Sequence, residues 1–169
     1  MAALIFPMTM MGQYTIYPVP HTQTAGTGTV SFTNIVNVVC DNGIDEATRN
    51  RVKDIFAAHN VTVNFSDAAS STESNVYLGV NGANGQGNAL ATQLGLSTDV
   101  LTKEGKFDRH ILSLTDGGNG TAQLLVLGEN TDATFFGLAS LEQMLDNGTE
   151  GLATVTINDY ADLKERGVI

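Results

Sequence analysis

A strand–helix–strand pattern between residues 35 and 65 restricts the possible folds most strongly. Residues 35–40 read IVNVVC, an apolar and β-branched run that is typical of a strand covered on both faces. Residues 46–59 carry apolar side chains along one helical face, and Asp45 precedes them as an N-cap. Residues 61–65 (VTVNF) alternate like a strand with one buried face. Strand, helix and strand in this order imply a parallel pair joined by a right-handed crossover.

A second unit, at residues 124–147, predicts a strand, a tight polar turn and an amphipathic helix. Gly137 in the middle of this helix suggests a close approach to another backbone. Phe135 and Phe136 fall on the polar side of the helix, where a domain that binds nothing seldom places two phenylalanines. We therefore expect a contact surface there. With Asp132 as N-cap, one arc facing the sheet contains Ala133, Thr134, Gly137, Leu138, Ser140, Leu141, Met144 and Leu145.

The rest of the chain adds short strands and turns around these two units. Prolines make residues 14–20 extended, residues 21–28 read as a glycine-punctuated turn, and residues 29–32 as a short strand. The fold class predicted is α/β (α+β): a two-layer mixed β-sheet with one βαβ crossover. Its two main helices are residues 46–59 and 133–146, with strands at residues 75–80, 109–115, 122–127 and 153–157 and a short helix at residues 89–96.

Composition excludes several kinds of partner. A formal charge of −10 with eight Lys and Arg argues against nucleic acid, whose phosphates need clustered basic side chains, and against anionic membranes. No apolar run reaches the roughly 20 residues of a membrane span, so we expect no membrane insertion. The lone Cys40 cannot form an internal disulfide, and its place after an apolar run favours a buried, inert thiol.

No motif in the chain indicates catalysis. His21, His59 and His110 have no metal-ligand spacing, and no Ser-His-Asp or Cys-His set stands out. The adjacent pair Asp45-Glu46 lies at a helix start, where negative charge is favoured in any case. The glycine-rich loop at residues 79–87 lacks the Lys-Ser/Thr ending of a phosphate-binding loop. We therefore expect no catalytic, metal-binding or cofactor-binding residues in this chain, and a phosphate ligand at the glycine loop is the weakest hypothesis.

A family resemblance covers most of residues 14–169. The run VLGENTDATFFGLASLEQML and the later VTINDYADLKERGVI resemble the end of the N-terminal domain of bacterial glycoside hydrolase family 84. The opening YTIYPVPHT and the stretch VNVVCDNGIDEATRNRVKDIFAAHNVTV are similar to that domain as well. Family 84 contains β-N-acetylglucosaminidases, including hyaluronidase-like and O-GlcNAcase-like enzymes. In families 84 and 20 such an α/β domain precedes a catalytic barrel and carries no catalytic residue.

The resemblance implies how the chain is organised. Residues 1–13 are expected to be a disordered leader or an expression remnant, and residues 14–158 the N-terminal α/β domain. Residues 159–169 are then a linker into a catalytic barrel that is missing, because Val168-Ile169 resembles the start of a strand without a partner. The parent enzyme is expected to be extracellular or on the bacterial cell surface.

The expected function is therefore that of a non-catalytic domain which packs against and stabilises a β-N-acetylglucosaminidase barrel. The parent protein is expected to be an enzyme of carbohydrate metabolism, whereas this fragment is not. Candidate interdomain contacts are Phe135, Phe136, Tyr160 and Arg166. The alternative is a carbohydrate-binding or adhesion module of an extracellular bacterial protein. It receives little support, because the chain has no Trp and its four Tyr are dispersed.

Overall fold

A computed structural model of the chain describes residues 14–164, which form one seven-stranded sheet with helices on both faces. The strands are β1 (Thr22–Val30), β2 (Ile35–Cys40), β3 (Thr62–Ser66), β4 (Ser74–Val80), β5 (Phe107–Asp116), β6 (Ala122–Gly128) and β7 (Leu152–Ala161). The helices are α1 (Glu46–Ala57), α2 (Gln86–Gln93) and α3 (Thr131–Met144), with a short 3₁₀ helix, η1 (Asp99–Thr102). The predicted leader at residues 1–13 and the last five residues of the predicted linker 159–169, with Arg166 and the Val168-Ile169 end, lie outside the described residues.

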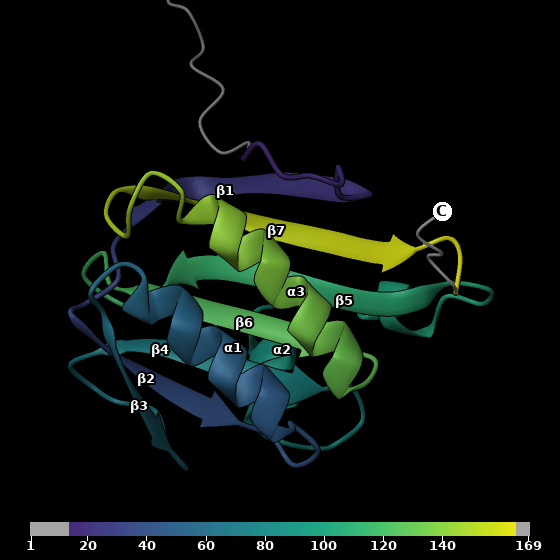
Figure 1. Cartoon of the computed structure of the whole chain (residues 1–169), viewed down its shortest axis with the longest axis horizontal. Helices are drawn as coiled ribbons and strands as arrows, with labels where there is room; N and C mark the ends of the chain where they lie inside the picture. Colours follow the sequence, from purple (N-terminus) through teal and green to yellow (C-terminus); the bar gives the residue numbers. More distant parts are fainter. Residues whose placement is uncertain (1–13, 165–169) are drawn as a thin grey trace, which may run out of the picture.

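The sheet is mixed, as the sequence predicted, with the strand order β1-β7-β5-β6-β4-β2-β3 (Figure 1). β2 pairs in parallel with β3, from Ile35 opposite Thr62 to Val39 opposite Ser66. β4 joins β2 and β6 in parallel, whereas β5, β6, β7 and β1 pair antiparallel. The predicted parallel pair joined through a helix is thus confirmed.

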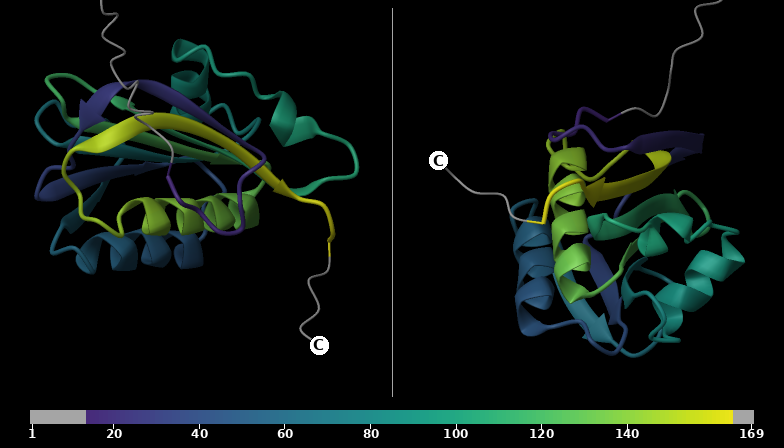
Figure 2. Two further views of the ribbon diagram at one scale, coloured as in Figure 1. Left: turned by 90° about the horizontal axis from the view of Figure 1, so that it is seen from above. Right: turned by 90° about the vertical axis from the view of Figure 1, so that its right-hand side faces the viewer.

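The helices lie in two unequal layers. The two long helices, α1 and α3, run side by side over one face of the sheet, and α2 and η1 cover part of the other face (Figure 2). The main core fills the space between the sheet and the two long helices; its fully buried members include Val38, Phe56, Leu112, Leu124 and Leu141. A smaller cluster under α2 and η1 includes Tyr77, Leu90, Leu101, Ile111 and Leu127.

Helix α1 begins where the sequence predicted. The side chain of Asp45 accepts a hydrogen bond of 2.8 Å from the backbone amide of Thr48, which satisfies one of the free amides at the helix start. The same hydrogen bond stabilises the carboxylate and lowers the pKa of Asp45. Val52, Ile55 and Phe56 are buried against the sheet. The Asp45-Glu46 pair therefore starts a helix.

Helix α3 confirms the predicted phase but begins slightly earlier. Its N-cap is Asn130, whose side chain accepts from the amide of Ala133 at 2.9 Å, and not Asp132. All eight residues of the predicted arc are buried. A Cβ at Gly137 would lie 2.7 Å from Val126 and 3.1 Å from His110. The glycine therefore lets α3 lie close to side chains of β5 and β6, and not to another backbone.

The turn β6–α3 is fixed by one buried hydroxyl. Thr134 is fully buried, and its Oγ1 donates 2.7 Å to the carbonyl of Gly79 in β4. The same oxygen accepts from the amide of Gly128, 3.1 Å away at the end of β6. The helix start is thus tied to two parallel strands at once.

The edge strand β1 corrects the sequence reading of residues 21–28 as a turn. Residues 22–28 belong to β1, which pairs antiparallel with β7 from Thr22 opposite Asn158 to Val30 opposite Leu152. The ladder is irregular between Ala25 and Thr29, where the two glycines of this segment lie. Local composition indicated a turn, but pairing with a long neighbouring strand overrides such preferences. β7 itself runs from Leu152 to Ala161 and is therefore longer than the predicted strand at residues 153–157.

Candidate functional site

One hollow gathers most of the exposed large apolar side chains of the described residues. Six such side chains are exposed, and four of them, Tyr17, Val19, Phe136 and Leu163, line a hollow of about 430 Å³. Their exposed fractions are 70% for Tyr17, 74% for Val19, 44% for Phe136 and 71% for Leu163. Large apolar side chains that gather on one surface patch mark an interaction site more often than scattered ones do.

Three distant parts of the chain supply the exposed apolar side chains of the hollow, and Asp108 and His110 of β5 line it as well. Residues 16–19 form one wall, the exposed ridge of α3 supplies Phe136 and Gln143, and the end of β7 continues into Leu163. Gln143 fixes the first wall to the helix, because it accepts 2.8 Å from the amide of Tyr17 and donates 3.0 Å to its carbonyl. The apolar residues are therefore presented on a braced surface.

The first wall is also fixed to the sheet. The hydroxyl of Tyr14 donates a hydrogen bond of 2.7 Å to the carbonyl of Ala153 in β7. The side-chain amide of Gln23 accepts a hydrogen bond from the backbone amide of Tyr14 and donates one to its carbonyl. Burial raises the pKa of Tyr14 to about 12, so this phenol stays protonated and keeps donating. Ile16 is buried in the main core.

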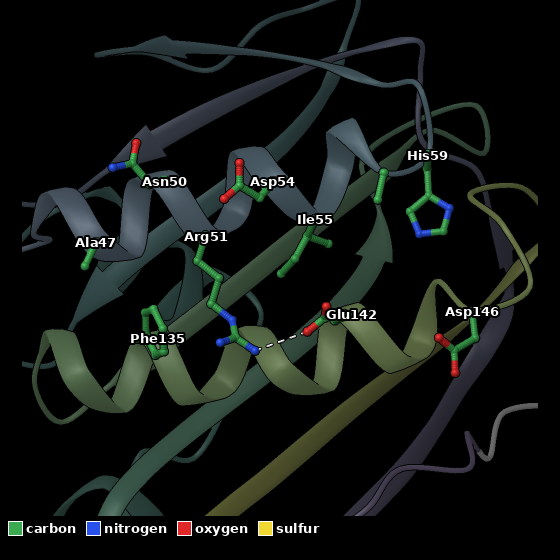
Figure 3. A pocket seen from close by; sticks show the side chains of 10 residues that line it. Ala47, Asn50, Arg51, Asp54, Ile55, His59, Phe135, Glu142 and Asp146 are labelled. Atoms are coloured by element: carbon green, nitrogen blue, oxygen red, sulfur yellow. Dashed lines mark hydrogen bonds and ion pairs between the residues drawn. The ribbon is translucent and has the colours of Figure 1, made fainter.

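Phe135 lies apart from this hollow, in a groove between α1 and α3 (Figure 3). The groove encloses about 520 Å³ and is lined mainly by polar side chains, among them Asp54 and His59. The Arg51 guanidinium lies 4.5 Å from the centre of the Phe135 ring and 3.2 Å from a carboxylate oxygen of Glu142. Phe135 is thus half-buried under an arginine that joins the two helices.

Tyr160 lines the hollow near the end of β7, and its ring is in contact with side chains of the same chain. The imidazole of His21 stacks on the ring at a centroid distance of 3.5 Å and an angle of 22°. Lys103 Nζ lies 4.5 Å from the ring centre and donates 2.9 Å to the hydroxyl. Little of this ring is left for stacking on a sugar, and Arg166 lies outside the described residues.

The structure therefore divides the predicted contact residues. Phe136 and Tyr160 line the same hollow, whereas Phe135 lines the neighbouring groove, and its ring is edge-on to that of Phe136 at 6.0 Å. Sequence reasoning missed Tyr17, Val19 and Leu163. Tyr17 and Val19 lie in the apolar segment YTIYPVP, which could have indicated a contact surface but for which we predicted only an extended backbone.

Two charged pairs involve residues at or just before the start of β5. Arg109 in β5 donates to Glu129 through its guanidinium and its backbone amide. Partial burial opposes the charge of Glu129, but these hydrogen bonds outweigh it and hold the pKa of Glu129 below its usual value. Lys106 donates 2.6 Å to Asp162, which lowers the pKa of Asp162.

The glycine-rich loop at residues 79–87 is built around a carboxylate of the same chain. A helix does follow the loop, since α2 begins at Gln86. The buried side chain of Asp41 accepts from the amide of Gly87 with both oxygens at 3.1 Å. A Cβ at Gly87 would lie 2.8 Å from Asp41 Oδ2 and 3.1 Å from the Cα of Gly79. Asp41 thus occupies the place a phosphate would take at this helix N-terminus.

The histidines and the cysteine form no further site. Within residues 14–164, no group of three or more His, Cys, Asp or Glu side chains could hold a metal ion. His59 lines the groove, His21 and His110 line the hollow, and burial raises the pKa of the half-buried Cys40 thiol to about 11. None of the helices in the described part of the chain is long and apolar enough to cross a bilayer.

Solved structures share this architecture. CpGH84D superposes with a TM-score of 0.82 and 28% identity, over 92% of this chain and 25% of that one. CpGH84B superposes with a TM-score of 0.65 and 20% identity, over 87% of this chain and 22% of that one. A family 20 exo-β-N-acetylglucosaminidase from Vibrio harveyi superposes with a TM-score of 0.56 and 11% identity, over 86% of this chain and 19% of that one. The chain therefore spans a quarter or less of the length of these proteins.

Family comparison agrees with the structural likeness. No curated protein matches the chain in sequence. The family described as glycosyl hydrolase family 20, domain 2, matches residues 13–160, which include every strand except the last residue of β7. The predicted resemblance to the domain that precedes the barrel in families 84 and 20 is thereby confirmed. The chain belongs to the glycosyl hydrolase family 20 domain 2 family, an accessory domain of hexosaminidase-type glycoside hydrolases.

Proposed function

We propose that this domain packs against the catalytic barrel of a longer β-N-acetylglucosaminidase, using the hollow formed by Tyr17, Val19, Phe136 and Leu163. The observation that carries the proposal is the gathering of these exposed apolar side chains where the chain leaves β7. Leu163, one residue before the last described residue, lines this surface, so a domain that followed in the same polypeptide would have this surface within reach. Covering this surface would remove apolar area from water, which contributes a favourable free energy of about 25 cal/mol for each Å² buried.

The braced geometry supports this role. Gln143 holds residues 16–19 on α3, and Tyr14 holds them on β7, so the walls of the hollow are ordered before a partner arrives. A preorganised surface loses less conformational entropy on binding than a mobile one. The neighbouring groove around Phe135 and Arg51 offers a more polar rim on the other side of the α3 ridge.

The chemistry of the reaction belongs to the proposed barrel. Within residues 14–164, no group of His, Cys, Asp and Glu side chains could hold a metal ion, and two of the three carboxylates in the hollow, those of Asp159 and Asp162, are paired with His21 or Lys106. The parent enzyme is, in this proposal, a β-N-acetylglucosaminidase that acts outside the cell or on its surface, as the family resemblance implies.

Activity and stability together test the proposal. The 169-residue chain should not hydrolyse a chromogenic N-acetyl-β-glucosaminide, while the polypeptide that includes the following domain should. In that longer protein, Phe136→Asp should lower the thermal midpoint of the catalytic part, whereas Phe65→Asp on the distant strand β3 should not. Hydrolysis by the 169 residues, or equal midpoints for the two variants, would refute the proposed role.

Calorimetry separates the proposal from the alternative of a carbohydrate-binding module. Titration of the 169-residue chain with N-acetylglucosamine oligomers should give no binding heat if the hollow takes a protein partner. Saturable heat that disappears with Tyr17→Ala would favour the carbohydrate-binding module, since Tyr17 is the most exposed aromatic ring of the hollow.

A further inference from the structure

Helix α2 covers part of the sheet face opposite α1 and α3, and it has little stability of its own (Figure 2). It has eight residues, and a helix of about two turns is not stable alone in water. Its buried apolar side chains, Leu90 and Ala91, belong to the smaller cluster that also contains Tyr77 and Leu127. The helical state of α2 therefore depends on its contacts with the sheet.

The start of α2 is fixed by a side chain from another part of the fold. Its N-cap, Gly85, has no side chain that could accept from the first amides of the helix. Asp41, directly after β2, supplies both acceptors: its two carboxylate oxygens accept from the amide of Gly87 at 3.1 Å. The side-chain amide of Asn88 donates 3.4 Å to the same carboxylate and 2.8 Å to the carbonyl of Val80. Asp41 is only 5% exposed, so these hydrogen bonds are shielded from water.

The chain on both sides of α2 can change direction easily. Gly82 has a φ of 80°, and Gly95, which ends the helix, has a φ of 66°. Glycine adopts this backbone without steric cost, and a Cβ at either position would meet nothing within 4 Å. The side chain of Gln86 also donates to the carbonyl of Asp67. In the described part of the chain, the side-chain hydrogen bonds between α2 and other segments therefore lie in its first turn.

We propose that α2 is a lid, held closed by Asp41, which opens as one unit while the sheet and the two long helices stay folded. Segments with few buried contacts open at a lower free energy than the core of the same protein. Opening exposes the smaller cluster and with it Tyr77, which is 8% exposed in the closed form. The lid lies on the face opposite α1 and α3, so it does not depend on the proposed docking through the hollow.

Hydrogen exchange of backbone amides in the 169-residue chain tests the lid. Leu94 and Leu96 supply the lid amides, which are hydrogen-bonded at the end of α2, and Leu125 in β6 and Phe56 in α1 supply the core amides. The lid amides should exchange faster than the core amides, because they need only α2 to open. In Asp41→Asn an NH₂ group replaces one accepting oxygen. The lid amides should then exchange about tenfold faster or more, since a hydrogen bond to a charged group is lost.

Two further variants decide the outcome. Leu138→Ala in the main core destabilises the closed and the open-lid forms equally. It should therefore accelerate the core amides about a hundredfold and leave the lid amides unchanged. Asp45→Asn makes the same side-chain exchange at the N-cap of α1 and should leave all rates nearly unchanged, because Asn caps a helix about as well as Asp.

Three results would overturn the lid. Acceleration of the lid amides by Leu138→Ala would show that α2 opens only when the whole domain unfolds. Unchanged lid amides in Asp41→Asn would show that this carboxylate does not hold α2 closed. Loss of the whole fold in Asp41→Asn would show that Asp41 stabilises the core instead of a separate lid.

Discussion

The two sides of α3 show how one helix can serve a core and a surface at once. On the inner side, Leu138 and Leu141 are fully buried, and Gly137 lets the helix approach β5 and β6 closely. On the outer side, Phe136 is 44% exposed and Phe135 lies under Arg51 in a groove. The inner side is apolar and buried by the domain itself, whereas the outer side places two phenylalanines among polar residues such as Glu142 and leaves Phe136 exposed.

The inner side of α3 therefore contributes to the stability of the domain, and the outer side is available for interaction with a partner. The inner side contributes by removing area from water and by satisfying buried polar groups, so its residues should be sensitive to small changes in volume. The outer side is held by contacts of exposed or half-exposed residues, so substitutions there should hardly alter the folding of the domain. The predictions below test this contrast in order of expected effect.

The largest effect is expected from truncating the inner side. Leu138→Ala should lower the free energy of unfolding by about 3 kcal/mol, because it removes a fully buried side chain and leaves a cavity. Urea unfolding of the 169-residue chain measures this loss. Leu163→Ala, at a residue 71% exposed, is the matched control and should change stability by less than about 0.5 kcal/mol. Equal losses of unfolding free energy for the two variants would contradict the difference between the buried side of α3 and the exposed surface.

A smaller loss is expected at the turn between β6 and α3. Thr134→Val keeps the shape but removes the hydroxyl that joins Gly79 and Gly128, so two buried backbone groups lose a partner. We expect a cost of about 1–3 kcal/mol in chemical denaturation. Thr62→Val, at an exposed site in β3, should be nearly neutral. A neutral Thr134→Val would show that the hydroxyl does not fix this turn.

The Arg109–Glu129 pair should give a pH-dependent contribution. Because the folded-state pKa of Glu129 is lowered, the pair stabilises the fold above the unfolded value of about 4.3 and loses this effect as pH falls through the folded pKa. We expect about 1 kcal/mol or less, since both side chains remain partly exposed. Stability profiles of the chain and of Arg109→Gln should converge once the pH has fallen below the lowered pKa of Glu129. Stability profiles that stay parallel at all pH values would contradict a pH-dependent contribution from the Arg109–Glu129 pair.

The smallest effect on the isolated chain is expected from the outer side. Phe136→Asp should change its free energy of unfolding by less than about 1 kcal/mol, because the ring is 44% exposed. Thermal unfolding followed by circular dichroism measures it. Collapse of the fold would mean that Phe136 belongs to the core, and the contrast between the two sides would fail.

Periodicity predicted the elements whose local and tertiary preferences agree. The arc of α3 and the parallel pair β2–β3 follow from apolar spacing, and the N-cap of α1 follows from Asp45. β1 was not predicted at its full length, because its glycines and threonines become a strand only through pairing with β7. Such long-range pairing leaves no local pattern.

The candidate site was predicted only in part for a similar reason. Helix phase placed Phe136 on the outer side, which the structure bears out. The hollow also needs Tyr17 and Leu163, which lie far from Phe136 in sequence and meet it only in the folded chain. Spacing along one element cannot reveal a surface shared by three segments.

Hydroxyl-radical footprinting tests the central claim most directly, because it reports the solvent exposure of individual side chains. It should compare the 169-residue chain with the longer protein that includes the following domain. The account predicts that Tyr17, Phe136 and Leu163 react several-fold more slowly in the longer protein. Phe65, which is 40% exposed on β3, should react equally in both. Equal reactivity of Phe136 in the two proteins, or protection of Phe65 instead, would contradict docking through the hollow.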